Sequence, residues 1–281
     1  MWRRCRGSLC RSLNIKTGLI VAILSGPVSA YAQKAPQPEV DLLLVLAVDV
    51  SESINKREAW LQRFGYAEAL TDPTVINAIR GGRLGRIALS YLEWAGASEQ
   101  HQVFGWTVID SMDSAKAVRA ELLAAPVSGG YWTSISAALD VASRMIATAP
   151  YQSERRVIDL SSDGRNNAGE PLAPVRQRVL RQRITINGLP VMAMRRNFSW
   201  PPIPYLDRYF KDCVIGGPGA FSELVEHYDD FAKTVRRKLI REIAGQRPSE
   251  AHVIPVSGGS PKSRIRCPET INSNSGDREK L

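Results

Sequence analysis

The chain has 281 residues, 44% of them hydrophobic and 23% charged, and these proportions exclude a wholly disordered, collagen-like or coiled-coil protein. The length suits one large domain or two small ones. The formal net charge of +9 would by itself suggest a nucleic-acid or membrane partner. However, five basic and no acidic residues fall within residues 1–32, which leaves 32 basic and 28 acidic residues, a net charge of +4, in the remainder. Ordinary solubility explains that charge, so no nucleic-acid partner is expected.

Residues 1–32 have the three parts of a secretory signal peptide. Basic residues come first, an apolar stretch occupies residues 19–24, and Ala30, Tyr31 and Ala32 form a small-residue cleavage motif. The apolar stretch is much shorter than the ~20 residues needed to span a membrane. We therefore expect cleavage after Ala32, export to the periplasm or the exterior, and no transmembrane anchor in the mature chain.

Residues 33–40 are expected to form a short linker, and residues 41–244 a single folded domain. The domain opens with the sequence DLLLVLAV at residues 41–48, an apolar run typical of a strand covered on both faces. A helix is predicted over residues 57–70, with Asn55 as its N-cap. Its expected apolar face consists of Trp60, Phe64, Ala67 and Leu70.

Strands and helices are predicted to alternate through the rest of the domain. Further strands are expected over residues 87–94, 102–108, 156–160, 184–191 and 212–215, the second of these near an edge. Further helices are expected over residues 114–123, 134–146, 172–182 and 222–243. Such alternation implies parallel pairing through right-handed crossovers. The predicted fold class is therefore α/β, a Rossmann-like open, mainly parallel sheet with helices on both faces.

The remaining segment, residues 245–281, is expected to be a disordered tail. It has 4 Pro, 4 Gly and 6 Ser among 37 residues, and it cannot bury enough apolar surface to offset the entropy of ordering. Cys5 and Cys10 belong to the expected signal peptide, which leaves Cys213 in the domain and Cys267 in the tail. In an oxidising compartment these two residues could form one disulfide or remain two free thiols.

Three polar segments lie where strands end or helices begin. Asp49, Ser51 and Ser53 form a D-x-S-x-S motif directly after the first strand, and Asp163 follows the strand at 156–160 in the sequence SSDG. Thr133 comes after a Gly-Gly loop and just before a predicted helix. Ligands of open α/β sheets bind at the carboxyl ends of the strands, so we expect the three segments to present two carboxylates and three hydroxyls together.

These oxygen-bearing side chains suit a hard divalent cation such as Mg²⁺ or Mn²⁺. Asp49 and Asp163 could coordinate the ion directly or hold its water ligands. With few direct carboxylates the ion stays positive and can accept one anionic oxygen from a partner. No His or Cys spacing favours zinc. Taken alone, the D-x-S-x-S residues could instead merely cap the next helix.

The motif set resembles the metal-ion-dependent adhesion site (MIDAS) of the von Willebrand factor A domain, over roughly residues 41–244. The stretches AVDVSESI, ALSYLEWAG, RRVIDLSSDGRNN, ITINGLP and VIGGPGAF are similar to an uncharacterised bacterial family of exported domains of this type. The resemblance implies a Rossmann-like sheet and Mg²⁺ or Mn²⁺ binding, but no established activity. The metal residues that it implies are Asp49, Ser51, Ser53, Thr133 and Asp163.

Four further residues are candidate ligand contacts. Glu52 stands where many such sites have a small residue, commonly Gly, and it could either disfavour acidic ligands or point outward. Trp132 precedes Thr133 on a loop and has the side chain most enriched at interfaces. Asn166 and Asn167 follow Asp163, and turn chemistry explains them equally well.

The predicted function is an exported, adhesion-type binding module that captures an acidic group of a protein partner through Mg²⁺. One alternative is a metal-dependent hydrolase, for which Glu52 is the only evident base. Another is an envelope structural protein with a vestigial metal site. The sequence contains no G-x-S-x-G elbow, so no catalytic residue is predicted.

Overall fold

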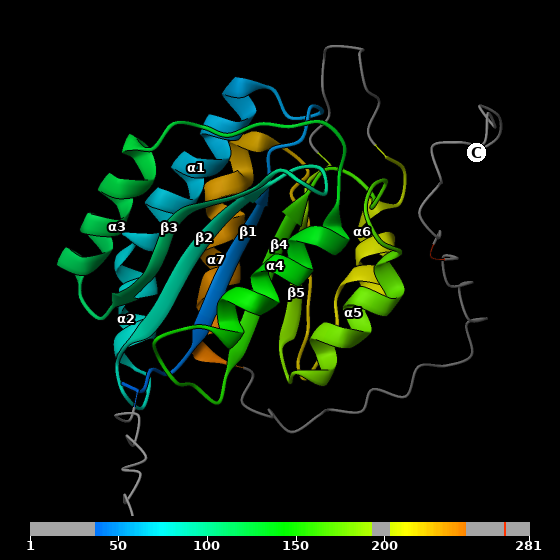
Figure 1. Ribbon diagram of the computed structural model, residues 1–281. Helices are drawn as coiled ribbons and strands as arrows, with labels where there is room; N and C mark the ends of the chain where they lie inside the picture. Colours follow the sequence, from blue (N-terminus) through cyan, green and yellow to red (C-terminus); the bar gives the residue numbers. More distant parts are fainter. Residues whose placement is uncertain (1–36, 193–202, 246–266, 268–281) are drawn as a thin grey trace, which may run out of the picture. The chain divides into compact units, whose positions relative to one another are not determined.

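A five-stranded sheet lies at the centre of the structure, with the strand order β3-β2-β1-β4-β5 (Figure 1). The computed structural model describes residues 37–192, 203–245 and Cys267, so the expected signal peptide and nearly all of the expected tail lie outside it. The strands are β1 (Leu43–Asp49), β2 (Ile87–Trp94), β3 (Gln100–Ile109), β4 (Arg156–Ser162) and β5 (Thr185–Pro190).

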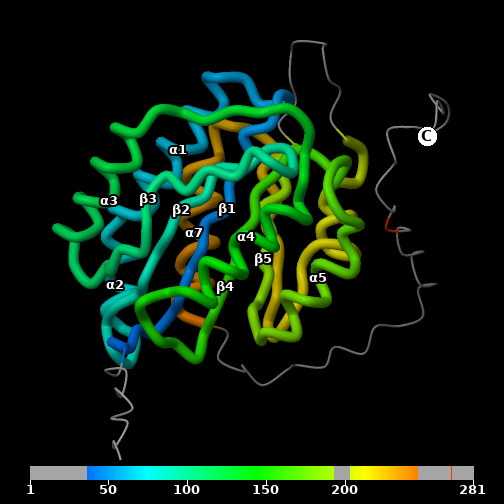
Figure 2. The backbone as a smooth tube through the Cα atoms, viewed as in Figure 1, coloured from blue at the N-terminus to red at the C-terminus, as the bar shows by residue number. Residues whose placement is uncertain are grey.

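Parallel pairing joins β1 to β2, β1 to β4, and β4 to β5. Figure 2 shows β2 and β4 on the two sides of β1. The edge strand β3 is the exception, because it runs antiparallel to β2. Only residues 95–99 connect these two strands, and such a short connection suits antiparallel pairing, whereas a parallel crossover needs a dozen residues or more. The sheet is therefore mainly parallel, as the alternation of elements predicts.

Helices cover both faces of the sheet and bury two separate apolar cores (Figure 1). One core lies between the sheet and the helices α1 (Lys56–Leu70), α2 (Pro73–Arg80), α3 (Met112–Ala124) and α7 (Phe231–Ala244). The other lies between the opposite face and the helices α4 (Ile135–Ala147), α5 (Leu172–Arg181) and α6 (Leu206–Tyr209). Since both faces are covered, β1 is buried at every residue, which explains its continuous apolar sequence.

Two local predictions near the end of the domain are wrong. Residues 212–215, expected as a strand, belong largely to a π-helix, Phe210–Val214, because an apolar run this short has no periodicity that separates strand from helix. The last helix begins at Phe231, after a short 3₁₀ helix, Tyr228–Asp230, and not near residue 222. Before it, Glu223 N donates to Gly188 O, so this part of the chain lies extended beside β5.

Helix α1 buries Ala67 and Leu70 of its predicted apolar face but differs from the prediction in its first turns. Asn55 caps it as expected, accepting from Glu58 N, but Trp60 is 48% exposed and stacks on Phe64 at the surface. Arg63 is buried instead, because it faces the carboxylate of Glu93 at the end of β2. No helix within residues 37–192 or 203–245 is long and apolar enough to cross a bilayer.

Candidate metal centre

The side chains of Asp49, Ser51, Ser53, Thr133 and Asp163, here called the oxygen cluster, come together at the carboxyl end of the sheet. Strands β1 and β4 are parallel neighbours, and the D-x-S-x-S motif and the Asp163 loop leave them at the same edge. The loop before α4 reaches this edge through a bridge between Gly130 and Ser51. Three loops distant in the sequence thus converge, as the predicted topology requires.

Short polar contacts link the members of the oxygen cluster. Ser53 Oγ donates to Asp163 Oδ1 at 2.7 Å, and the hydroxyl oxygens of Ser51 and Ser53 lie 3.2 Å apart. Thr133 Oγ1 lies 3.5 Å from Ser51 Oγ. Four of the five residues singled out in the sequence, all except Asp49, therefore belong to one connected group of oxygen atoms.

Asp49 is the buried anchor of this group. Its Oδ1 accepts from Ser51 N at 2.8 Å, and its Oδ2 accepts from Ser162 Oγ. Burial and, next, the negative charge of Asp163 raise the pKa of Asp49 to about 7, although the hydrogen bonds from Ser162 and Ser51 act in the opposite direction. A cation between the two carboxylates would offset both effects that raise this pKa.

Sequence reasoning missed Ser162, which connects Asp49 to the Asp163 loop. Besides donating to Asp49, its hydroxyl accepts from Gly164 N at 3.0 Å. Its position directly before Asp163 could have indicated a contact with Asp49, because a residue at the last position of β4 lies beside the end of β1. The backbone of Gly164 packs closely on Thr133, so a Cβ there would lie 3.0 Å from Thr133 Oγ1.

The two asparagines hold the loops of the cluster to each other. Thr133 N donates to Asn167 Oδ1 at 2.7 Å, and Asn167 N donates back to Thr133 O at 2.9 Å. Asn166 is buried; its Oδ1 accepts from Ser136 N, and its own N–H donates to Tyr209 Oη. The structure thus gives both amides a bracing role between loops. This role is compatible with the turn chemistry seen in the sequence.

Trp132 and Glu52 are both exposed to solvent. Trp132 has 61% of its surface exposed and its neighbour Tyr131 66%, and both residues directly precede Thr133 on the same loop. The φ of Trp132 is 66°, a left-handed conformation that is uncommon for a bulky residue. Sequence reasoning named Trp132 but overlooked Tyr131.

The donor set fits a hard divalent cation. All five side chains offer oxygen, two of them as carboxylates and three as neutral hydroxyls, which are ligands typical of Mg²⁺ and Mn²⁺. Among the described residues no three His, Cys, Asp or Glu side chains are grouped to hold a metal ion, so a metal at this edge must rely on the hydroxyls. The roles of the five residues as ligands stay a prediction.

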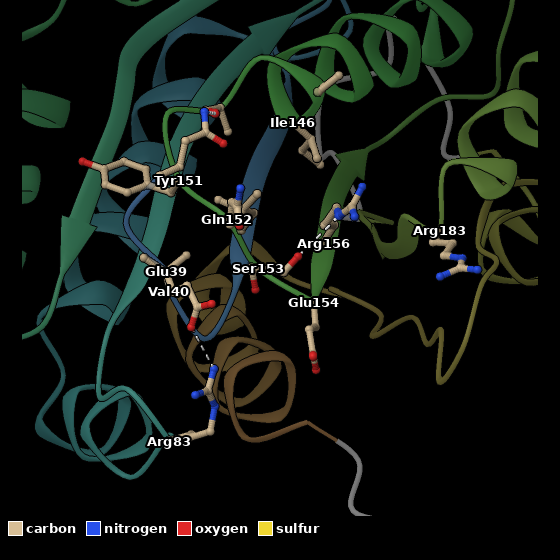
Figure 3. A pocket seen from close by; sticks show the side chains of 14 residues that line it. Glu39, Val40, Arg83, Ile146, Tyr151, Gln152, Ser153, Glu154, Arg156 and Arg183 are labelled. Atoms are coloured by element: carbon tan, nitrogen blue, oxygen red, sulfur yellow. Dashed lines mark hydrogen bonds and ion pairs between the residues drawn. The ribbon is translucent and has the colours of Figure 1, made fainter. Parts of the chain in front are cut away.

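A separate cavity of about 720 Å³ lies at the opposite, amino end of the strands. Figure 3 shows its lining, in which Arg83 pairs with Glu39 and Arg156 donates to the backbone of Ser153. Its charged side chains are of both signs. This cavity has no connection to the oxygen cluster, and it is not part of the candidate site.

Comparison with protein families gives one match, which spans the whole described domain. Residues 39–247 match the model of a family of unknown function, DUF1194. The chain belongs to the DUF1194 family. A comparison with curated proteins gives no match.

Solved structures show that this DUF1194 domain has the von Willebrand factor A fold. The pilus adhesin SpaC of Lactobacillus rhamnosus GG, in its open conformation, has a TM-score of 0.54 and 12% identity, over 75% of this chain and 31% of the adhesin. A von Willebrand factor type A protein from Catenulispora acidiphila has a TM-score of 0.51 and 14% identity, over 73% of this chain and 43% of its own.

A third similar structure is named together with a metal site. Proximal thread matrix protein 1 of the mussel byssus, described with a zinc-occupied MIDAS motif, has a TM-score of 0.55 and 12% identity, over 75% of this chain and 50% of its own. The matched region therefore spans between about a third and a half of these three proteins. At such low identity the likeness concerns the fold alone.

Proposed function

We propose that this protein is an exported, adhesion-type binding module that presents a Mg²⁺ or Mn²⁺ ion to a carboxylate of a protein partner. The observation that carries the proposal is the oxygen cluster, which brings together five predicted ligand residues from three loops. Side-chain contacts of 2.7–3.5 Å link four of them, and Asp49 accepts from Ser51 N at 2.8 Å. Export is proposed from the signal-peptide pattern of residues 1–32. The partner remains defined by its chemistry alone.

The donor set of the cluster supports a role in capture. Asp49 and Asp163 could coordinate the ion directly or hold its water ligands, and the three hydroxyls add no charge, so with few direct carboxylates a divalent ion stays positive. Protein ligands alone leave room for a further oxygen in an octahedral shell, and a carboxylate is the strongest neutralising ligand that a protein partner offers there. Zinc occupies the MIDAS motif of the similar mussel protein. The donor set of the present chain consists of oxygen atoms alone, which favours Mg²⁺ or Mn²⁺.

The loop beside the cluster offers a surface for the rest of the partner. Tyr131 and Trp132 expose large rings, while bonds from Gly130 to Ser51 and from Thr133 to Asn167 fix the loop that carries them. Rigid aromatic side chains contribute contact area at low cost in conformational entropy. The left-handed backbone of Trp132 is strain of the kind that collects at binding sites.

Binding is favoured over catalysis. Glu52, the one base that the sequence suggested for a hydrolase, is exposed to solvent, whereas enzymes usually tune a general base by burial and neighbouring charges. The name of one similar structure, a pilus adhesin, agrees with a binding role. Turnover of phosphoester, ester or peptide substrates in the presence of Mn²⁺ would contradict this preference.

The proposal can be tested with Mn²⁺ and a small carboxylate probe. Water-proton relaxation detects the water molecules on protein-bound Mn²⁺. The peptide Gly-Asp-Gly, acetylated at its N-terminus and amidated at its C-terminus so that the Asp side chain is its one carboxylate, should displace one of them, whereas Gly-Asn-Gly capped in the same way should not. The Asp163→Ala variant should bind little Mn²⁺ and show neither effect. Equal relaxation changes with the two peptides would contradict capture of a carboxylate, and an absence of Mn²⁺ binding would contradict the metal site itself.

A further inference from the structure

An ion pair is buried directly behind the oxygen cluster. Arg63 of α1 and Glu93 of β2 have side chains only 2% and 0% exposed, with Arg63 Nε 2.6 Å from Glu93 Oε1. Glu93 pairs with Val48, the residue before Asp49. The ion pair therefore joins β2, at a position beside the first site strand, to the helix that follows the D-x-S-x-S motif.

The same two side chains also hold the chain that leaves α3. The guanidinium of Arg63 donates to Leu122 O at 3.3 Å, to Ala125 O, and to Pro126 O at 2.9 Å. The second oxygen of Glu93 accepts from Ser128 N at 2.9 Å. Four backbone groups within residues 122–128 are thus fixed to one ion pair.

This anchored segment leads straight into the site. Two residues after Ser128, Gly130 bridges to Ser51, and Thr133 follows three residues later. Close packing leaves little freedom at the bridge, since a Cβ on Gly130 would lie 2.8 Å from the Cβ of Ala95. A change in the backbone position of residues 122–128 would therefore shift Thr133 relative to Ser51.

Stability alone does not explain a pair of this kind. Apolar residues of similar volume often replace a buried ion pair with no loss of stability. A guanidinium, by contrast, offers five donors in a fixed planar arrangement, which suits several carbonyl groups and a carboxylate at once. We infer that Arg63 and Glu93 are positioning residues that set the Thr133 loop against the D-x-S-x-S motif; this inference rests on the proposed metal site.

Two variants separate positioning from folding. Arg63→Met combined with Glu93→Leu removes the anchor without leaving an unpaired buried charge, and Arg63→Lys keeps a positive charge beside Glu93 but cannot reach the spread of carbonyls. The matched control is Arg119→Gln, which removes the Arg119–Glu68 pair between the same helices α3 and α1, away from the loop. Mn²⁺ affinity would be measured by electron paramagnetic resonance of free Mn²⁺, and thermal unfolding in EDTA would report folding.

Both variants should bind Mn²⁺ roughly 10–100-fold more weakly, as expected for residues that orient metal ligands, while Arg119→Gln keeps the wild-type affinity. If one variant does not fold, the other decides. Wild-type Mn²⁺ affinity in a folded variant, with only its unfolding temperature changed, would make the pair purely structural and leave the proposed function intact. Wild-type protein that binds no Mn²⁺ would overturn both proposals.

Discussion

Asp49 and Asp163 bring two carboxyl groups to the oxygen cluster, and Asp49 is completely buried. In the absence of a cation, their mutual repulsion opposes ionisation of both groups. Metal binding should relieve this repulsion and stabilise the fold. The stabilisation should reach about 2.7 kcal/mol when the ion is at 100 times its dissociation constant.

Thermal unfolding in EDTA and then in increasing Mg²⁺ would measure this stabilisation. The wild-type unfolding temperature should rise and then saturate, and the rise should disappear in Asp49→Ala. Glu52→Ala, which removes an exposed carboxylate on the same loop, should keep the rise in unfolding temperature. Saturable stabilisation that persists in Asp49→Ala would place the ion elsewhere.

Gly164 offers a second test at single-residue scale. A Cβ at this position would lie 3.0 Å from Thr133 Oγ1 and 3.2 Å from its Cγ2, so Gly164→Ala should push Thr133 away from Ser51. We expect roughly tenfold weaker Mn²⁺ binding, as for other changes that misplace a ligand. Gly105→Ala is the control, because its nearest neighbour would be 3.9 Å away. Calorimetric titration that finds equal affinities for the two variants would argue against Thr133 as a ligand.

At the scale of elements, α7 is joined to the sheet by a buried charged group. Lys238 Nζ lies 2.5 Å from Asp159 Oδ1 of β4 and contacts Glu242 Oε1, which also accepts from Asn187 Nδ2 of β5 at 2.9 Å. Two carboxylates face one ammonium group, so one negative charge is in excess. Burial, followed by repulsion from Asp159, raises the pKa of Glu242 to about 7.

This pKa makes stability depend on pH. The native state holds a proton on Glu242 more tightly than the unfolded chain, whose pKa is near 4.5, so the free energy of unfolding should fall as the pH rises from about 4.5 to about 7. The loss should be on the order of 3 kcal/mol. Glu242→Gln should remove this part of the pH dependence, whereas Glu226→Gln, at an exposed position, should retain it. Urea unfolding across this range would measure both, and parallel curves for all three proteins would refute the assignment.

The elements also show what the sequence could and could not predict. The continuous apolar run of β1 and the alternation of predicted strands and helices located the sheet, and the known geometry of parallel strands brought Asp49 and Asp163 to one edge. Periodicity could not show that Arg63 faces inward, because its burial depends on Glu93, 30 residues away. Nor could it show that residues near Glu223 lie extended along β5, since those bonds are made with a distant strand. The roles of Ser162 and Tyr131 likewise depend on neighbours that only the folded chain supplies.

At the scale of the whole molecule, a disulfide joins the domain to the C-terminal segment. Cys213 is buried in the π-helix, Cys267 is exposed, and 54 residues separate them. The sequence left a disulfide and two free thiols equally open, and the structure contains the disulfide. Closing a loop of this length should stabilise the fold by up to about 4 kcal/mol through the entropy of the unfolded chain.

Cys267→Ser should therefore lower the urea midpoint without disturbing the buried side of the bond. Dithiothreitol should lower the wild-type midpoint to that of the variant and leave the variant unchanged. A wild-type midpoint that does not respond to dithiothreitol under conditions that reduce the bond would contradict a stabilising role.

The start of the described chain lies far from the oxygen cluster. Gln37 Nε2 donates to Ala149 O and Val40 N donates to Gln152 O, beside the amino ends of β1 and β4, whereas the cluster occupies their carboxyl ends (Figure 1). If the protein is attached to a sensor surface through a tag placed before Gln37, the edge that carries the oxygen cluster should therefore point into the solution. Biotinylation at that side should give binding curves free of steric blocking by the support.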